Sequence, residues 1–292
     1  MNISDKIINY IQRTQGDFNE RFSGVPSKKG ASDLLSPEKP REQISLLRRY
    51  INSDLRGKRL LEIGSGLGVF NVMARTEYGI DAWGVEPSTE GFWGSFETSI
   101  ELLKENGLST EKIVNSIGEM LPFEKETFDI VFSTNVLEHV MRPEKVIREA
   151  IRVCKRGGVI QIVTPNYGSF YDGHYACFYF PYQPKWFWKI YIKYVLKKDT
   201  SFAYTLRTEI NYFTLKKWIA PFLANKEIEI LSYGEEILRE RMNELNFSSW
   251  ASLGKVKRWA EFIKKLGLTK IAIKFLIFTR SLTPIILTIK KI

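Results

Sequence analysis

The sequence predicts an α/β fold in which a mostly parallel sheet carries helices on both faces. An apolar run at residues 59–63 enters a loop with three glycines, and an amphipathic segment leaves it, which is the pattern of a strand, a tight turn and a helix. Apolar and amphipathic segments then alternate as far as residue 164. Such alternation is typical of parallel strands joined by crossover helices. A chain of 292 residues allows one elaborated domain or two small ones.

The N-terminal segment, residues 1–57, is predicted to be mainly helical. Residues 1–24 and 43–51 have apolar side chains at helical spacing. The prolines and glycines between residues 24 and 40 predict a loop that separates the two helical stretches.

The core is expected over residues 58–166. The predicted strands are Arg59–Ile63, Ala82–Val85, Ile113–Asn115, Phe128–Ser133 and Val159–Thr164. The predicted helices are Val69–Arg75, Glu97–Asn106 and Pro143–Cys154. Gly79 and Gly107 are suited to end two of these helices, and Pro143 is suited to the first turn of the third.

Residues 213–235 are expected to complete the core. Thr214 is placed to cap the helix that follows it, and residues 227–233 alternate as a late strand does. No final strand is identified after them. The remaining segments are an insertion at 167–212 and a basic helical C-terminal extension at 236–292.

The spacing of the glycines narrows the choice of ligand. A dinucleotide-binding loop has the pattern G-x-G-x-x-G/A, which lets a pyrophosphate approach a helix N-terminus. Here the third glycine, Gly68, comes one place early and bulky Val69 follows it. Glu62 would repel a pyrophosphate but can accept hydrogen bonds from an ammonium group. A ligand with an amino-acid tail and no phosphates fits better, which disfavours a nicotinamide-dependent oxidoreductase.

A second acid, Glu86, ends the next predicted strand, where a carboxylate can accept both hydroxyls of a ribose. In a parallel sheet the ligand lies over the carboxyl ends of the strands. That rule selects the glycine loop, Glu86, the stretch 116–119 and the stretch 134–139 as candidate binding residues.

Four blocks carry a family resemblance: E-I-G-S-G-L-G at 62–68, G-V-E-P-S at 84–88, and the stretches 121–140 and 156–166. In this order and at this spacing the chain resembles the class I S-adenosylmethionine-dependent methyltransferases. The resemblance implies a Rossmann-like methyltransferase fold, methyl transfer and S-adenosylmethionine as cofactor. The cofactor-binding residues that it implies, together with the strand-end rule, are Glu62, Gly64, Ser65, Gly66, Gly68, Glu86, Pro87, Ile117, Gly118, Glu119 and Asn135.

The resemblance also implies a lid role for the helix before the first strand, with simple packing on the sheet as the alternative. It raises the question of a metal, because some metal-using relatives carry E-x-x-E-H where this chain has Asn135-Val136-Leu137-Glu138-His139. Asn135 replaces the first carboxylate, so a divalent ion would be poorly held and we expect no required metal. His139 is then either a helix-start residue that packs near the cofactor or a catalytic residue.

The insertion is dense in aromatic residues and begins at the carboxyl end of the fifth predicted strand, where relatives place a substrate lid. Within it, His174 is a candidate general base for a hydroxyl acceptor, oriented by Asp172. A structural histidine in a tight turn is the alternative. An amine or carboxylate acceptor would need no such base.

The charge of the chain is unevenly spread. Residues 1–183 carry a balance of −2 and residues 184–292 a balance of +12, which indicates an anionic partner. Residues 250–292 hold ten Lys or Arg and one acid, with Ile271, Phe275, Phe278 and Leu282 as a helical apolar stripe. We expect this extension to lie on an anionic membrane surface. A helix packed on the insertion is the alternative, and nucleic acid is disfavoured because the basic residues neighbour aliphatics.

The predicted function is O-methylation of a hydroxyl on a saccharide or lipid-linked glycan. It rests on the aromatic rings of the insertion, which can pack on sugar faces, on the basic C-terminal extension, and on a looser resemblance to bacterial methyltransferases of cell-surface polysaccharides. A quinone or other lipid acceptor is the alternative, as is a non-catalytic protein that binds S-adenosylmethionine at a membrane surface. Two cysteines without metal spacing and an N-terminus without a signal-peptide pattern predict a cytoplasmic location, at the inner face of the membrane.

Overall fold

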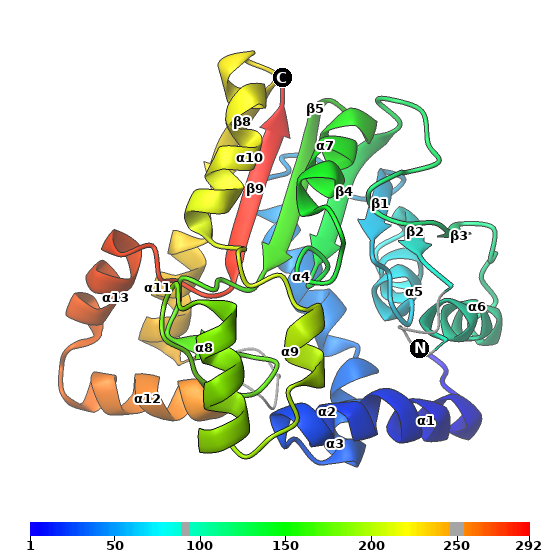
Figure 1. Cartoon of the computed structure of the whole chain (residues 1–292). Coiled ribbons are helices and arrows are strands. Elements are labelled where there is room, and N and C mark those ends of the chain that lie inside the picture. The colour runs from blue at the N-terminus through cyan, green and yellow to red at the C-terminus, as the bar shows by residue number, and fades with distance from the viewer. Residues whose placement is uncertain (89–93, 246–253) are drawn as a thin grey trace.

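The structure is a computed structural model that describes residues 1–88, 94–245 and 254–292. Its centre is a seven-stranded sheet in the order β3-β2-β1-β4-β5-β9-β8 (Figure 1). The strands are β1 Arg59–Ile63, β2 Asp81–Glu86, β3 Ile113–Asn115, β4 Phe128–Thr134, β5 Cys154–Thr164, β8 Ile228–Ser232 and β9 Ile285–Lys291. The five strands β1 to β5 are parallel, and β9 runs antiparallel to both β5 and β8. The predicted fold class is confirmed.

Helices cover both faces of the sheet because its central strands are apolar on both sides. Leu60 of β1 packs with Ile44 of α4 (Glu38–Arg48) and Phe70 of α5 (Val69–Thr76). The next residue, Leu61, points to the other face, where it joins the core under α7 (Pro143–Val153) and α10 (Tyr212–Ala224). α6 (Ser95–Glu105) packs beside β3.

The strand order reverses between β1 and β4. β1 pairs with β2 on one side and with β4 on the other. The loops that leave the carboxyl ends of β1 and β4 therefore run in opposite directions. Such a switch point leaves a crevice in which open α/β sheets bind their ligands. It places the glycine loop and the stretch after residue 134 at one edge of the sheet.

The last segment of the chain is a strand, which corrects the expectation that residues 236–292 form a wholly helical extension. β9 lies in the sheet with Ile285, Ile286, Leu287 and Ile289 buried, as suits a run of β-branched and apolar residues between two neighbours. Leu282 is also buried, so it does not continue the exposed helical stripe. The other domain limits stay predictions, and residues 246–253 of this segment lie outside the described residues.

The helical part of the extension comprises α11 (Glu235–Glu244), α12 (Gly254–Lys265) and α13 (Thr269–Phe278). None of the helices in the three described ranges is both long enough and apolar enough to cross a membrane.

The N-terminal segment contains α1 (Asp5–Ile11), the π-helical turn η1 (Gln12–Gly16), α2 (Asp17–Ser23) and α3 (Ser27–Leu34), followed by α4. The loop expected between residues 24 and 40 is therefore wrong over α3. Gly30 there allows close packing of two helices and makes no turn, since a Cβ on it would lie 3.3 Å from Asn19. α4 packs on the sheet, which is the simpler of its two expected roles.

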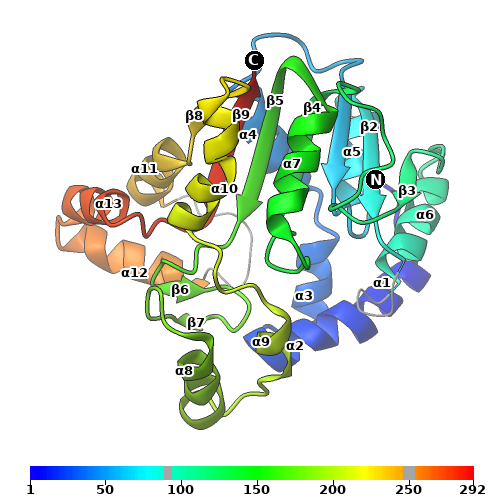
Figure 2. The same ribbon diagram turned by 45° about the horizontal axis from the view of Figure 1, so that its top comes forward.

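The insertion lies beyond the carboxyl ends of β4 and β5, on the same side as α1 to α3 (Figure 2). It contains the hairpin β6 (Tyr171–Asp172) and β7 (Cys177–Phe178), then α8 (Lys185–Ile190), the π-helical turn η3 (Tyr191–Val195) and α9 (Ser201–Thr205). Three fully buried rings, Tyr175, Tyr179 and Trp188, hold it together through edge contacts at 5.4 and 5.5 Å.

The chain returns to the core at α10. Asn211 caps this helix, because its side chain accepts hydrogen bonds from the N–H groups of Phe213 and Thr214. The expected cap, Thr214, instead donates its hydroxyl to the carbonyl of Glu209. β8 follows where a late strand was predicted.

Candidate functional site

The loop after β1 has a backbone that only glycine adopts easily. Gly64, Gly66 and Gly68 all have positive φ, and Gly68 precedes the first residue of α5. A Cβ on Gly64 would collide with the side chain of Val136, and one on Gly68 would lie 3.0 Å from Ser99. A Cβ on Gly66 would meet nothing within 4 Å. The loop is therefore held tightly at both ends and is open at its middle.

Two buried carboxylates flank this loop. Glu86, at the end of β2, accepts a hydrogen bond from the N–H of Gly66 at 2.8 Å, and burial raises its pKa to about 7. Glu62 is fully buried, and burial followed by the charge of Glu86 raises its pKa. Among the described residues, Oε2 of Glu62 and the hydroxyl of Ser65 have no hydrogen-bond partner. Such orphaned buried groups are suited to a polar ligand, and a cation would neutralise Glu62.

The other predicted cofactor residues surround the same edge. Asn135 follows β4 with a φ of 53° and donates its N–H to the carbonyl of Val163. Gly118 lies against β1, since a Cβ on it would be 2.9 Å from Ile63, and Ile117 beside it is exposed. Pro87 directly follows β2. These positions agree with a ligand over β1 and β2, although contact with the cofactor stays a prediction.

Glu119 has a structural partner that the sequence did not reveal. Its Oε1 accepts hydrogen bonds from the N–H groups of Met141 at 2.9 Å and Arg142 at 3.2 Å, so it holds the turn before α7. Its predicted role in cofactor binding stays a prediction.

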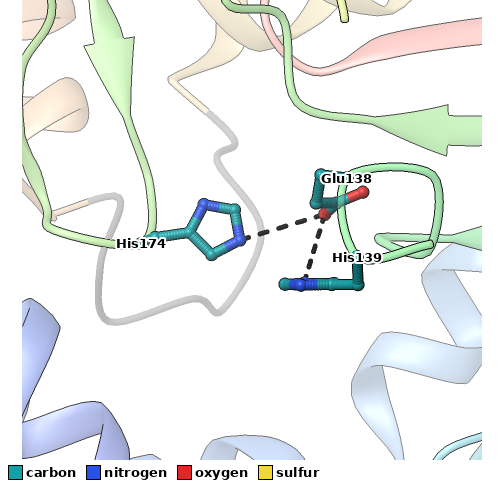
Figure 3. Close-up of side chains that lie close together, drawn as sticks. All are labelled: Glu138, His139 and His174. Atoms are coloured by element: carbon teal, nitrogen blue, oxygen red, sulfur yellow. Dashed lines mark ion pairs between the residues drawn. The ribbon is translucent and has the colours of Figure 1, made fainter. Parts of the chain in front are cut away.

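The three predicted catalytic residues, Asp172, His139 and His174, lie together around Glu138, which was not predicted to be catalytic. Figure 3 shows Glu138 with the two histidines. Oε1 of Glu138 lies 3.8 Å from Nε2 of His139 and 3.9 Å from Nε2 of His174. Nδ1 of His174 lies 3.5 Å from Oδ2 of Asp172. Glu138 is 0% exposed, and its Oε1 has no hydrogen-bond partner among the described residues. The insertion thus places Asp172 and His174 against the segment that follows β4.

Backbone contacts hold this cluster in place. Oδ1 of Asp172 accepts the N–H of Tyr175 at 2.8 Å and closes the β6–β7 hairpin. Oε2 of Glu138 accepts the hydroxyl of Thr164, at the end of β5, at 3.4 Å. The N–H of Arg207 donates to the carbonyl of Glu138 at 2.9 Å, which joins the end of the insertion to the core.

Burial and mutual charge shift the protonation of the cluster. Burial raises the pKa of Glu138 to about 7, and burial together with His174 lowers that of His139 to about 3. Burial lowers the pKa of His174, but Asp172 and Glu138 raise it more, so its net shift is upward. His174 is thus the imidazole in this cluster that is able to hold a proton near neutral pH.

Phe202 of α9 packs on both imidazoles. Its ring stacks on His139 at 5.8 Å and meets the edge of His174 at 5.4 Å. The same ring contacts Phe18 and Phe22 of α2. The N-terminal helices and the insertion therefore close over the cluster together. Because His139 lies in a turn that ends before α7, the expectation of a histidine at a helix start is wrong.

The donor atoms of Glu138, His139 and His174 lie within 4.8 Å of one another, so this group could hold a divalent ion. The sequence offers only the neighbours Glu138 and His139 as possible metal ligands, and on these two the expectation of no required metal was based. His174 comes from the insertion, and the sequence alone does not bring it to this place. That no metal is required stays a prediction.

Sequence reasoning missed Glu138 as a member of this buried cluster and Phe202 as the ring that covers it. Glu138 was visible beside His139, but its role depends on its burial against His174. Phe202 had no local signal that separated it from the other aromatic residues of the insertion.

Comparison with known proteins adds a family to this geometry. Residues 61–162 match the family model of a methyltransferase domain. An uncharacterized protein of Mycobacterium tuberculosis is 32% identical over 132 residues, which are 44% of this chain and 44% of that protein. The norajmaline N-methyltransferase of Rauvolfia serpentina is 34% identical over 117 residues, which are 39% of this chain and 38% of that enzyme. The chain thus spans less than half the length of these curated relatives.

Among solved structures, the Haemonchus contortus phosphoethanolamine N-methyltransferase 2 in complex with S-adenosyl-L-methionine is similar with a TM-score of 0.51. The identity is 19%, and the match covers 99% of this chain and 59% of that one. At this identity the likeness concerns the fold alone.

Proposed function

We propose that the chain methylates a hydroxyl of a saccharide or lipid-linked glycan, using S-adenosylmethionine as cofactor and residues 61–162, which match a methyltransferase domain, as its catalytic core. The observation that carries the hydroxyl acceptor is the placement of His174 between Asp172 and Glu138, beside the cofactor edge of the sheet. The proposed location is the cytoplasmic face of a membrane.

The residues at the cofactor edge suit S-adenosylmethionine. Glu62 is a buried carboxylate whose Oε2 is without a partner among the described residues, which suits the ammonium of an amino-acid tail. Glu86 at the end of β2 would accept ribose hydroxyls. The open space at Gly66 would let the ligand approach the backbone. The cofactor supplies a methyl group on a sulfonium, which is already activated for transfer.

The two halves of the site are connected by one short segment. Val136 contacts the glycine loop at Gly64, and Glu138 and His139 follow two and three residues later. A hydroxyl held at His174 would therefore lie near the cofactor edge, and alignment of acceptor and donor is a large part of methyl-transfer catalysis.

His174 would take the proton of the acceptor hydroxyl as the oxygen attacks. Asp172 would hold the imidazole by Nδ1, so that Nε2 faces the acceptor side, next to Glu138. Because Asp172 and Glu138 favour the protonated imidazole, the proton can stay on His174 until product leaves. An amine acceptor that reacts as the free base would not need this arrangement.

The test is a transfer assay with radiolabelled S-adenosylmethionine and two acceptor pools, lipid-linked saccharides and quinone precursors with a free hydroxyl. We expect label in the saccharide as a methyl ether. His174→Ala should lower kcat by about 10²- to 10⁴-fold, the range of general-base catalysis, while calorimetry finds unchanged cofactor binding. Chelation with EDTA should leave the rate unchanged.

Other outcomes separate the alternatives. Label in the quinone pool would replace the acceptor class but keep the methyltransferase. Cofactor binding without transfer to either pool would support a non-catalytic binding protein. If His174→Ala leaves the rate unchanged, His174 is not the general base. If EDTA abolishes the rate, the cluster of Glu138, His139 and His174 binds a metal that the reaction needs.

A further inference from the structure

Two basic segments of the chain expose large apolar side chains to solvent. In the first, α8 with η3, Trp186 is 62% exposed. In the second, α12 with α13, Trp259 is 67% exposed and Phe278 is 87% exposed. Single exposed apolar residues are ordinary on a protein surface, but clusters of this kind mark interaction sites.

A row of aromatic contacts joins the two segments into one surface. Phe275 of α13 stacks on Phe170 with 6.0 Å between ring centroids. Phe170 contacts Phe178 of the hairpin, Phe178 contacts Phe180 at 4.9 Å, and Phe180 contacts Phe187 of α8 at 5.8 Å. We call this continuous area, from α12 and α13 through the hairpin to α8 and η3, the aromatic-basic surface.

α13 shows how the surface is built. Ile273 is buried against Met242 and Ala260, which fixes one side of the helix to α11 and α12. Ile271 and Phe278 lie on another side and are exposed. α13 touches the insertion through Phe275, which stacks on Phe170, but Ile271 and Phe278 of its apolar stripe stay exposed to solvent.

The charge of the surface indicates its partner. Residues 185–198 contain five lysines and no acid, and residues 254–278 contain seven Lys or Arg and only Glu261 as an acid. A second copy of the chain would place the same cations opposite one another, which is repulsive. The exposed rings among the cations would also suit stacking bases, but the exposed aliphatics Leu266, Leu268 and Ile271 suit acyl chains and offer nothing for a base to stack on.

We propose that the aromatic-basic surface binds the surface of an anionic membrane, with its apolar side chains in the interface and its lysines at the lipid headgroups. Trp and Tyr side chains are suited to this depth, and Lys stems reach from the apolar layer to the charged one. The exposed Trp186 and Trp259 would occupy the headgroup level on the two arms of the surface.

The hairpin connects this surface to the catalytic cluster. Tyr171 pairs with Phe178, and Asp172 pairs with Cys177. Asp172 and Cys177 are buried, whereas Phe178 is exposed on the surface. One hairpin thus carries the residue that would position His174 on one side and a membrane-facing ring on the other. Membrane docking would place the site next to the headgroups, where a lipid-linked acceptor resides; this last step alone rests on the proposed function.

The experiment is co-sedimentation of the full chain with vesicles of phosphatidylcholine alone or with 30% phosphatidylglycerol, at low and high salt, without cofactor or acceptor. We expect binding only to the anionic vesicles, weakened by salt. Lys265→Ala/Lys270→Ala/Lys274→Ala should bind about 100-fold more weakly, from the usual contribution of surface lysines. The matched control Lys104→Ala/Lys125→Ala/Lys145→Ala removes three exposed lysines of the core and should bind more strongly than the first variant by most of that factor.

Ile271→Ser/Phe278→Ser tests the apolar part, with Met120→Ser as an exposed control elsewhere. The double variant should bind about tenfold or more weakly, and the control should bind like wild type. Wild type that ignores anionic vesicles at low salt would overturn the proposal. So would equal losses in both lysine variants, or tighter binding to RNA that Ile271→Ser/Phe278→Ser leaves unchanged. His174→Ala should bind vesicles like wild type, so failure of the docking and failure of the methyl transfer are separate results.

Discussion

The two halves of the proposed site, one for the cofactor and one for the acceptor, are formed by different kinds of groups. The cofactor edge is mostly backbone, with three glycines of fixed positive φ and the ends of β1, β2 and β4. The proposed acceptor side is mostly side chains, with imidazoles, carboxylates and rings, and the insertion supplies Asp172, His174 and Phe202. A backbone site tolerates little change in sequence, whereas a side-chain site on an insertion can be altered without disturbing the sheet. This is the physical basis on which one fold accepts different acceptors.

The same division appears in charge. The half of the chain with β1 to β5 is close to neutral, and the half with most of the insertion helices and the extension holds the entire positive excess. Cofactor binding within the sheet does not require that excess. The charge is instead placed on the surface that we assign to the membrane.

The largest effect is expected when one methyl group is added to the glycine loop. Gly64→Ala should destabilise the protein by about 2–5 kcal/mol, because it adds left-handed strain to a collision with Val136. Urea unfolding measures the stability, and calorimetry should find cofactor binding lost.

Two variants separate strain from collision. Gly57 also has a positive φ, but a Cβ on it would meet nothing within 4 Å, so Gly57→Ala should cost only about 1–2 kcal/mol. Gly64→Ala/Val136→Ala should recover part of the loss by removing the collision. If Gly64→Ala costs no more than Gly57→Ala, the loop is not held as tightly as the structure indicates.

The difference between the halves also decides how far sequence reasoning reached. β1 and β3 were predicted at their observed limits, and the ends of β4, α5 and α7 were correct within one residue. These elements are encoded locally, by apolar runs and by glycines that the loop needs. Their order along the chain, together with the four blocks that resemble the methyltransferase family, was enough to indicate the fold and the cofactor.

The errors lie where distant residues decide. α3 was missed because Gly30 serves a helix contact with Asn19 and makes no turn. β9 was missed because its partners, β5 and β8, lie more than fifty residues earlier in the chain. The local pattern of apolar and basic residues fits a strand and an interfacial helix equally well. Asp172 and His174 were found by residue type, but the buried carboxylate that they face, Glu138, depends on how the insertion folds back.

A smaller effect is expected on how the stability of the protein depends on pH. Burial raises the pKa of Glu86 to about 7 in the folded protein, well above that of a carboxylate in the unfolded chain. The native state therefore binds more protons between about pH 4 and pH 7, and its stability falls as the pH rises through that window. Glu86→Gln removes this dependence, so its stability relative to wild type should rise by up to about 3 kcal/mol from pH 4 to pH 8.

Urea unfolding of both proteins at several pH values measures this difference. The exposed Glu111→Gln serves as a control and should change little across the range. A difference between Glu86→Gln and wild type that stays constant with pH would show that the pKa of Glu86 is the same in the folded and the unfolded chain. Water would then reach the Glu86 carboxylate more easily than its burial indicates.

The smallest expected effect lies at the junction of the two halves, where the insertion returns to the sheet. Asn211→Ala removes the side chain that accepts from the N–H groups of Phe213 and Thr214, and it should cost about 1 kcal/mol of stability. Thr214→Ala removes one hydroxyl bond to the carbonyl of Glu209 and should cost less, and Asn211→Asp should keep the cap. Thermal unfolding ranks the three variants. A larger loss for Thr214→Ala than for Asn211→Ala would favour Thr214, the cap that the sequence predicts, over Asn211.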